Sequence, residues 1–287
     1  MYTTLISVEQ LRDLQASGRP LMVFDCSFDL MDPAKGPNAY REAHLPGAVY
    51  AHLDTALSAK HDPVAASGGR HPLPSREKFA AWLTSVGFTN PMQAVVCDRN
   101  GANYCGRLWW MLKWAGHDAV AVLDGGLQAW QAAGGAVASG DEPARPAAAT
   151  RFELGAPLRA LVAADAVLDQ LGRASQTLID ARATPRFKGE TEPIDPVAGH
   201  IPGALNRPFG QNIGADGRFK PAAALKAEFE TLLAGRDPAS VVHHCGSGVS
   251  AIPNLLAMEL AGLGKTRLYA GSWSDWCADS SRPMAQG

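Results

Sequence analysis

The sequence HLPGA at residues 44–48 returns as HIPGA at residues 200–204, 156 residues further along the chain. A second signal keeps the same order, because an apolar run ends in Asp25 in the first half and in Asp180 in the second. A repeat of this length forms a complete domain rather than one layer of a stacked array. The chain is therefore expected to contain two domains of one fold.

Composition marks the boundary between the repeats. Residues 139–150 read SGDEPARPAAAT, with two prolines and no hydrophobic periodicity, which is typical of a semi-extended linker. We therefore expect one domain over residues 1–138, a linker over residues 139–150 and a second domain over residues 151–287. The length of 287 residues supports this division, because it exceeds that of one average domain.

Short apolar runs alternate with helical patterns in both halves. Strands are expected near residues 21–25, 94–98, 120–123, 177–181, 241–244 and 267–270, and helices near residues 7–16, 75–86, 107–115, 162–171, 221–233 and 250–260. Ser7 and Gln10 predict a capping box at the start of the first helix. This alternation predicts an α/β fold of tandem domains, each with a mostly parallel sheet flanked by helices.

Composition also narrows the classes of partner. The 26 basic and 28 acidic residues give a net charge of −2, which offers no attraction to nucleic acid or to an anionic membrane. No stretch approaches the roughly 18 consecutive apolar residues of a membrane helix, and the first residues lack the pattern of a secretion signal. A cytoplasmic protein with a small-molecule substrate is therefore expected.

The cysteines form an odd set without any C-x-x-C pair, so neither a disulfide framework nor a zinc site is expected. They are Cys26, Cys97, Cys105, Cys245 and Cys277. Most are expected to be buried as small apolar side chains. The sequence assigns no role to Cys97, Cys105 or Cys277.

The candidate site lies where the two repeats differ. Ligands of an open α/β sheet bind beyond the carboxyl ends of its strands, which directs attention to the turns that follow them. Alignment of the strands near residues 94–98 and 241–244 puts Asp98 opposite Cys245. One domain thus has a carboxylate where the other has a thiol.

The residues after Cys245 predict a tight glycine-rich turn. They are Gly246, Ser247, Gly248, Val249 and Ser250. Backbone N–H groups of such a turn, with the N-terminus of the following helix, favour the thiolate and would also hold a persulfide. An inert buried cysteine is the alternative. His243 and His244 are interpreted as structural, because neighbours on a strand point to opposite faces and at most one of them can face the turn.

This loop, both HxPGA segments and residues 271–273, GSW, resemble the two-domain rhodanese and 3-mercaptopyruvate sulfurtransferase family along the whole chain. The resemblance implies that Cys245 takes a sulfur atom from a small-molecule donor and carries it as a persulfide. A thiophilic acceptor such as cyanide, a small thiol or reduced thioredoxin then removes the sulfur, without a metal or organic cofactor. The first domain, with Asp98 in place of the nucleophile, is expected to be catalytically silent. The substrate is expected to meet the turn residues Gly246, Gly248, Val249 and Ser250.

The neighbours of Cys245 indicate 3-mercaptopyruvate as the donor. Family members that prefer thiosulfate carry basic residues directly after the cysteine, because the thiosulfate dianion needs cationic partners. In this chain Gly246 and Ser247 follow the cysteine, and both are neutral. In the mercaptopyruvate branch, the serine is thought to work with a histidine and an aspartate of the first domain, which match His71 and Asp62. The stretch that holds both is nine residues longer than its counterpart in the second repeat and could reach the other domain. A solvated surface loop is the alternative.

Arg186 matches the arginine that binds the donor's carboxylate in the mercaptopyruvate branch, and its planar fork suits that task. The family's second substrate arginine follows Glu-Pro, yet Ile194 follows Glu192 and Pro193 here. Arg182 is expected to be a structural ion-pair partner.

Three other functions fit parts of the sequence. A thiosulfate sulfurtransferase, or rhodanese proper, would use the same nucleophile with a different donor. A cysteine-dependent phosphatase needs an arginine six positions after the cysteine, where this chain has Ala251. A non-catalytic sulfur-carrier module would keep the fold without turnover, and the intact Cys245 argues against it.

Overall fold

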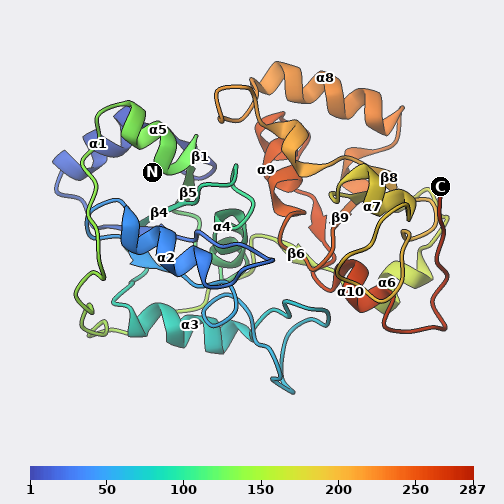
Figure 1. Cartoon of the computed structure of the whole chain (residues 1–287), viewed down its shortest axis with the longest axis horizontal. Helices are drawn as coiled ribbons and strands as arrows, with labels where there is room; N and C mark the ends of the chain where they lie inside the picture. The colour runs from blue at the N-terminus through green and yellow to red at the C-terminus, as the bar shows by residue number, and fades with distance from the viewer. The chain divides into compact units, whose positions relative to one another are not determined.

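The chain folds into two compact units, and the computed structural model describes residues 1–287 (Figure 1). The first unit comprises Met1–Val64, Pro74–Leu158 and Ala215–Arg218, and the second comprises Ala65–Leu73, Arg159–Gly214 and Phe219–Gly287. The segment Ala65–Leu73, from the longer stretch of the first repeat, thus belongs to the second unit. Residues 139–150, expected as a linker, belong to the first.

The first unit is built on a five-stranded parallel sheet with the order β1-β5-β4-β2-β3. Its strands are β1 (Leu5–Ile6), β2 (Leu21–Asp25), β3 (Val49–Tyr50), β4 (Gln93–Cys97) and β5 (Val120–Leu123). Its helices are α1 (Val8–Ala16), α2 (Lys35–Glu42), α3 (Arg76–Ser85), α4 (Cys105–Trp114) and α5 (Gly126–Ala132). Because β4 is central, the turn that follows it opens at the middle of the sheet's carboxyl edge.

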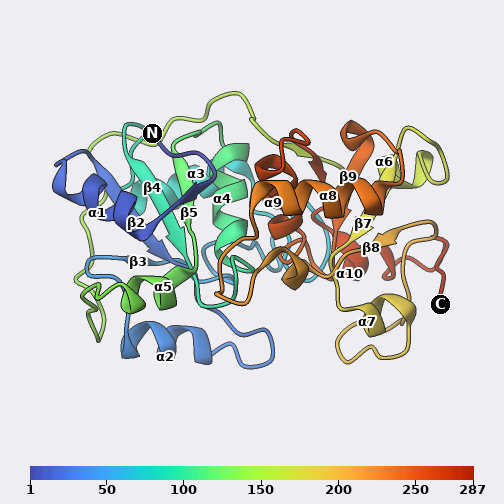
Figure 2. The same ribbon diagram turned by 90° about the horizontal axis from the view of Figure 1, so that it is seen from above.

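Helices cover both faces of this sheet, whose strands β4 and β5 run side by side in Figure 2. The helices α1 and α5 pack on one face, where Trp130 joins their shared core. The helix α3 packs on the other face, where the ring of Trp82 lies 5.9 Å from that of Phe24 in β2. The capping box of Ser7 and Gln10 is confirmed at the start of α1.

The second unit repeats this plan, with the strand order β6-β10-β9-β7-β8 and all pairs parallel. Its strands are β6 (Ala160–Leu161), β7 (Thr177–Asp180), β8 (Leu205–Asn206), β9 (Val241–His244) and β10 (Arg267–Leu268). Its helices are α6 (Ala164–Asp169), α7 (Thr184–Lys188), α8 (Ala222–Leu233), α9 (Ile252–Leu260) and α10 (Ser272–Trp276), with short 3-10 turns η1 (Phe209–Asn212) and η2 (Pro238–Ser240).

The central strand β9 is buried on both faces, as strands of a covered parallel sheet are. Val242 packs with Trp273 in the core beneath α6 and α10. Its neighbour Val241 packs with Phe229 in the core beneath α8 and α9. The residue that follows β9 therefore emerges at the middle of the carboxyl edge, between two layers of helices.

The expected α/β architecture is confirmed in both units. The strands β2, β5 and β9 have the predicted bounds, because β2 and β5 are apolar runs that end at an aspartate or just before one, and β9 is a short buried segment followed by a glycine-rich turn. The two-residue strands β1, β3, β6 and β8 were not predicted, since a run that short has no readable period. None of the helices has the length and apolar character that crossing a bilayer requires.

Candidate active site

Cys245 leaves the end of β9 and starts the loop that leads into α9. The N-terminal turn of α10 holds the backbone of this residue and the next. The Cys245 N–H donates to Ser272 Oγ at 3.1 Å, and the Cys245 carbonyl accepts from the Trp273 N–H at 2.9 Å. The Gly246 carbonyl accepts from the Ser274 N–H at 2.9 Å. Ser272 has a positive φ of 58°, a conformation that side chains rarely adopt and that clusters at functional sites.

The loop is shaped by Gly248. Its φ is +73°, and a side chain there would collide with the carbonyl of Ala270 just before α10. Several backbone N–H groups around it donate to no other group of the protein, namely those of Gly246, Ser247, Val249 and Ser250. Such groups are suited to an anion beside the thiol.

The equivalent loop of the first unit carries an anion of its own. The carboxylate of Asp98, the residue aligned with Cys245, is buried and accepts backbone hydrogen bonds on both oxygens. Its donors are the N–H groups of Asn100 at 2.9 Å, Ala102 at 3.1 Å, Tyr104 at 2.8 Å and Cys105 at 2.9 Å. The loop after the central strand of this fold therefore directs its N–H groups at the side chain of its first residue.

His71 and Ser247 are brought together, as expected. His71 Nδ1 lies 2.7 Å from Ser247 Oγ, and both side chains are buried. The segment Ala65–Leu73 is fixed on the second unit by the Arg70 N–H, which donates to Ser274 Oγ at 3.0 Å, and by Gly69, whose positive φ lets it pack on the Gly271 carbonyl. A hydrogen bond between imidazole and hydroxyl can pass a proton in either direction.

Asp62 makes different contacts. Its carboxylate pairs with Lys78 and accepts from the Val64 N–H at 3.1 Å. These bonds, that of Lys78 foremost, hold the pKa of Asp62 below its usual range. Asp62 is therefore a carboxylate at neutral pH, and a role beside His71 stays a prediction.

Arg186 is held by two carboxylates in the second unit. Its Nη2 donates to Glu192 Oε1 at 2.6 Å and to Asp195 Oδ2 at 3.1 Å, and its Nε donates to Glu192 Oε2 at 3.2 Å. Burial opposes the charge of Glu192, yet the bonds from Arg186 and from the Asp195 N–H keep its pKa below its usual value. The arginine is thus fixed in place, and its Nη1 is left outside this network.

Arg70 is a site residue that sequence reasoning missed. Its Nη1 pairs with Asp195, while its Nε and Nη2 are buried and have no hydrogen-bond partner. A methyl group built on Gly246 would lie 3.1 Å from Arg70 Nη2 and 3.7 Å from Arg186 Nη1. The cation that the loop sequence lacks is therefore supplied from a distant part of the chain. The only sequence signal was its position directly before His71.

The remaining polar residues near the loop have structural contacts. Arg182 pairs with Asp180 at 2.7 Å and donates to the Gly199 carbonyl at 2.7 Å, as expected for an ion-pair partner. Burial lowers the pKa of His243 to about 3, and burial also lowers the pKa of His244, against the attraction of Asp180. Both histidines are fully buried, which supports their structural interpretation.

The other cysteines are poor nucleophiles. Burial raises the pKa of Cys26, Cys97 and Cys105 well above the ordinary value and raises that of Cys277 as well. A thiol that stays protonated does not attack sulfur. Cys245 is the cysteine that precedes a loop of unpartnered N–H groups, and two guanidinium groups approach its neighbour Gly246.

Comparison of the sequence with known proteins finds one family twice. The rhodanese-like domain model matches residues 7–133 and 163–279. A Pseudomonas aeruginosa protein named "Probable 3-mercaptopyruvate sulfurtransferase" is 46% identical, over 99% of this chain and 98% of the relative. The mouse thiosulfate sulfurtransferase is 32% identical, over 96% of this chain and 92% of the relative.

Solved structures agree with the sequence matches. The 3-mercaptopyruvate sulfurtransferase of Leishmania major aligns with a TM-score of 0.82 at 29% identity, over 98% of this chain and 76% of that one. The Escherichia coli protein SseA, described as a 3-mercaptopyruvate sulfotransferase, aligns with a TM-score of 0.77 at 28% identity, over 95% of this chain and 100% of that one. The chain therefore belongs to the two-domain rhodanese and 3-mercaptopyruvate sulfurtransferase family.

Proposed function

We propose that this protein is a sulfurtransferase that moves a sulfur atom from 3-mercaptopyruvate to a thiophilic acceptor, with Cys245 as the nucleophile and its persulfide as the intermediate. The observation that carries the donor assignment is the 2.7 Å hydrogen bond between His71 Nδ1 and Ser247 Oγ beside the loop of Cys245. A histidine and serine pair that can transfer a proton suits this donor, because the donor's thiol must lose a proton and its methylene carbon must gain one.

The first half-reaction forms an S–S bond and breaks a C–S bond. The Cys245 thiolate attacks the donor's sulfur, and the C–S electron pair passes to the methylene carbon, where the adjacent carbonyl spreads it as an enolate. The proton of the donor's thiol is transferred to that carbon, which leaves pyruvate and a persulfide anion. In the second half-reaction, cyanide or a thiolate attacks the outer sulfur, and the Cys245 thiolate departs.

Ser247 and His71 are proposed to carry the proton between the donor's sulfur and carbon. General acid–base catalysis by a positioned side chain contributes about 10²- to 10⁴-fold in rate. Asp62 belongs to the proposal as the third member of this catalytic set, as in the mercaptopyruvate branch that the sequence resembles.

The backbone of the loop is proposed to hold the persulfide anion. The unpartnered N–H groups of Gly246, Val249 and Ser250 support this role, and Gly248 permits the turn that presents them. The four N–H groups that bind the carboxylate of Asp98 in the sister loop are an internal precedent. Thiolate and persulfide anions are stabilised by such donors as a carboxylate is.

The donor's carboxylate is proposed to bind the nitrogens of two guanidinium groups that are left outside their ion pairs. Arg186 offers Nη1, and Arg70 offers Nε and Nη2, all outside their bonds to Glu192 and Asp195. Two guanidinium groups can satisfy both oxygens of one carboxylate. Arg70 then serves where Ile194 stands in place of an arginine.

Thiosulfate is the second candidate donor. The observation that favours it is the position of Arg70 Nη2 near Gly246, since a cation beside the nucleophile also suits a dianion. The nucleophile, persulfide and acceptors would be unchanged.

The proposal assigns catalysis to the domain at residues 151–287 and a silent role to the domain at residues 1–138, joined by residues 139–150. Support comes from Asp98, whose carboxylate stands where the nucleophile would be. The acceptor is a small thiol, cyanide or a thioredoxin-like protein.

Steady-state kinetics with both donors tests the assignment. With cyanide as acceptor, kcat/KM is expected to be higher for 3-mercaptopyruvate than for thiosulfate. The reverse order would return the protein to the thiosulfate branch. One burst of pyruvate without further turnover would indicate a sulfur carrier, and hydrolysis of an aryl phosphate would indicate the phosphatase alternative.

A further inference from the structure

The two HxPGA turns have the same construction. The ring of His44 stacks on Tyr40 with centroids 4.0 Å apart, and its Nδ1 bonds to the Tyr40 carbonyl at 2.7 Å. The ring of His200 stacks on Phe187 with centroids 3.9 Å apart, and its Nδ1 bonds to the Phe187 carbonyl at 2.8 Å. In both turns the ring is thus fixed with Nε2 directed to the same place.

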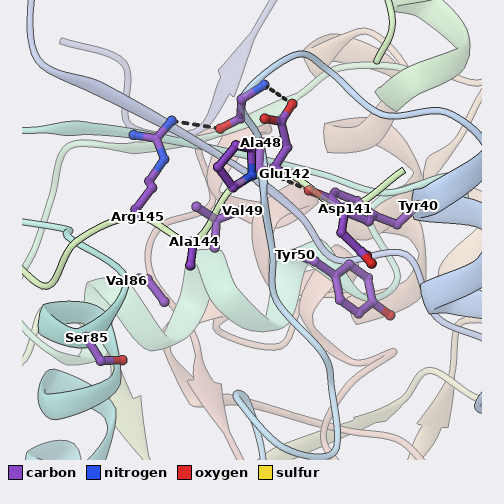
Figure 3. A pocket seen from close by; sticks show the side chains of 12 residues that line it. Tyr40, Ala48, Val49, Tyr50, Ser85, Val86, Asp141, Glu142, Ala144 and Arg145 are labelled. Carbon is purple, nitrogen blue, oxygen red and sulfur yellow. Dashed lines mark hydrogen bonds between the residues drawn. The ribbon is translucent and has the colours of Figure 1, made fainter. Parts of the chain in front are cut away.

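In the first unit this turn binds a carboxylate of the chain itself. Glu142 accepts from the Gly47 N–H at 2.7 Å, and its Oε1 lies 3.2 Å from His44 Nε2. Arg145 Nη2 donates to the Gly47 carbonyl at 2.8 Å, so that Figure 3 shows Glu142 and Arg145 reaching one turn from two sides. The Gly47 N–H, above all, holds the pKa of Glu142 below its usual value, as a carboxylate site should.

The segment at residues 138–148 follows an extended path from this turn to the end of α3. It starts as an antiparallel bridge between Ala138 and His44. It ends where the Ala148 N–H donates to the Thr84 carbonyl at 2.8 Å, and on the way the Pro146 carbonyl covers Gly87. Between segment, turn and helix lies a cavity of about 480 Å³.

In the second unit the same turn has no such occupant. His200 forms the equivalent antiparallel bridge with Ala285, yet its Nε2 and the Gly203 N–H make no hydrogen bond within the protein. The His200 side chain is nevertheless buried, with 7% of the residue exposed. No atom lies within 4 Å of a methyl group built on Gly203, or on Gly235, the counterpart of Gly87 at the end of α8.

Gly203 and Gly235 line one groove, next to the turn that His200 begins. The second-unit groove has a volume of about 810 Å³, and the residues that matter here are Arg173, Pro202, Gly203, Gly235, Arg236 and Asp237. Two arginines against one aspartate give its rim a net positive charge, which complements an acidic ligand.

We propose that the second-unit groove binds an extended acidic segment of another protein, with one carboxylate on His200 Nε2 and the Gly203 N–H. The bound segment takes the path over Gly235 that residues 141–148 take over Gly87. An extended chain seated in a preformed groove gains specificity from a few side chains, here from the carboxylate at the turn. The site is separate from the loop of Cys245, so the inference does not depend on the proposed sulfur transfer.

A peptide with the sequence of residues 141–148, DEPARPAA, is the probe, because these residues fit the equivalent groove, and Ala285 already holds the place of Ala138 in the second unit. Calorimetric titration of the full-length protein should show saturable binding, and the amide resonance of Gly203 should shift. The peptide with Glu142→Gln should bind about 10- to 100-fold more weakly, because it loses a charge-assisted hydrogen bond. Equal affinity of the two peptides, or no binding at millimolar peptide, would overturn the proposal.

Matched variants separate the groove from general charge. Arg236→Glu, at the rim, should weaken peptide binding about tenfold, whereas Lys265→Glu, which is exposed and does not line the groove, should leave it unchanged. Equal losses in both variants would reduce the effect to net charge. If free glutamate displaced the peptide at a concentration equal to that of the peptide, the groove would be a site for small carboxylates. If light scattering showed a dimer, the groove would be assigned to a second copy of this chain.

Discussion

Arg70 should contribute to binding the donor's carboxylate in place of the arginine that Ile194 replaces. The change Arg70→Ala removes a side chain that is 22% exposed, with one nitrogen on Asp195 and two buried nitrogens without a partner. Loss of a charge-assisted hydrogen bond costs about 1.5 to 3 kcal/mol, or about 10- to 150-fold in kcat/KM. Because the carboxylate is bound before and during reaction, the loss should fall mainly on KM.

The assay is the release of pyruvate from 3-mercaptopyruvate with cyanide as acceptor. Arg70→Lys should lie between the wild type and Arg70→Ala, since a lysine keeps the charge and loses the planar fork. Arg186→Ala should also raise KM, and the double variant should fall short of the product of the single effects because both arginines contact Asp195. Lys265→Ala, an exposed cation away from the loop, is the control and should behave as the wild type.

Two results would refute this reasoning. A kcat/KM within about twofold of the wild type in Arg70→Ala would mean that the unpartnered nitrogens do not meet the donor. A large fall in kcat with KM unchanged would place Arg70 in the chemical step, against the carboxylate-binding role.

Three other predictions follow from the same contacts. Ser247→Ala should lower kcat by about a hundredfold with KM little changed. Adding His71→Gln to that variant should lower kcat little further, because both groups handle the same proton. If the two losses in the rate of pyruvate release multiply, this shared role is contradicted. Asp98→Ala should lower the free energy of unfolding, measured in urea, by about 3 kcal/mol or more, because it leaves four N–H groups unpaired. Cys245 of this variant should still accept sulfur. Lost turnover in a fully folded variant would mean that the first domain is not silent. Burial lowers the pKa of His243 to about 3 from 6.5, so the unfolded chain takes up this proton first and stability is lost as pH falls below about 6.5. His243→Leu should therefore lose about 2 kcal/mol less than the wild type between pH 7 and pH 5 in urea titrations, and an unchanged pH dependence would contradict the buried neutral imidazole.

The sequence predicted those parts of the fold that local pattern determines. The strand β9 begins with two valines and is followed by a glycine-rich turn, so its end and the position of Cys245 could be located by pattern alone. The duplication then identified Asp98 as the counterpart of Cys245. The short edge strands β3 and β8 depend on pairing with β2 and β7, and no local pattern encodes that.

The site could be predicted only in part, because only some of its residues are neighbours in the sequence. Ser247 follows the nucleophile in sequence, whereas Arg70 is distant, and its sequence context of two glycines is typical of a solvated loop. Its importance arises only when Ala65–Leu73 joins the second unit and Arg70 meets Asp195. The carboxylates that hold Arg186 also could not be predicted from any single motif, because ion pairs between loops follow from tertiary packing.

The central claim is that Cys245 alone carries the transferred sulfur. Its most direct test is intact-mass measurement with peptide mapping after addition of 3-mercaptopyruvate without acceptor. One added sulfur atom on the peptide that contains Cys245, removed by cyanide and absent from Cys245→Ser, is the predicted result. Added sulfur on Cys26, Cys97, Cys105 or Cys277 in its place, or full turnover by Cys245→Ser, would contradict the account.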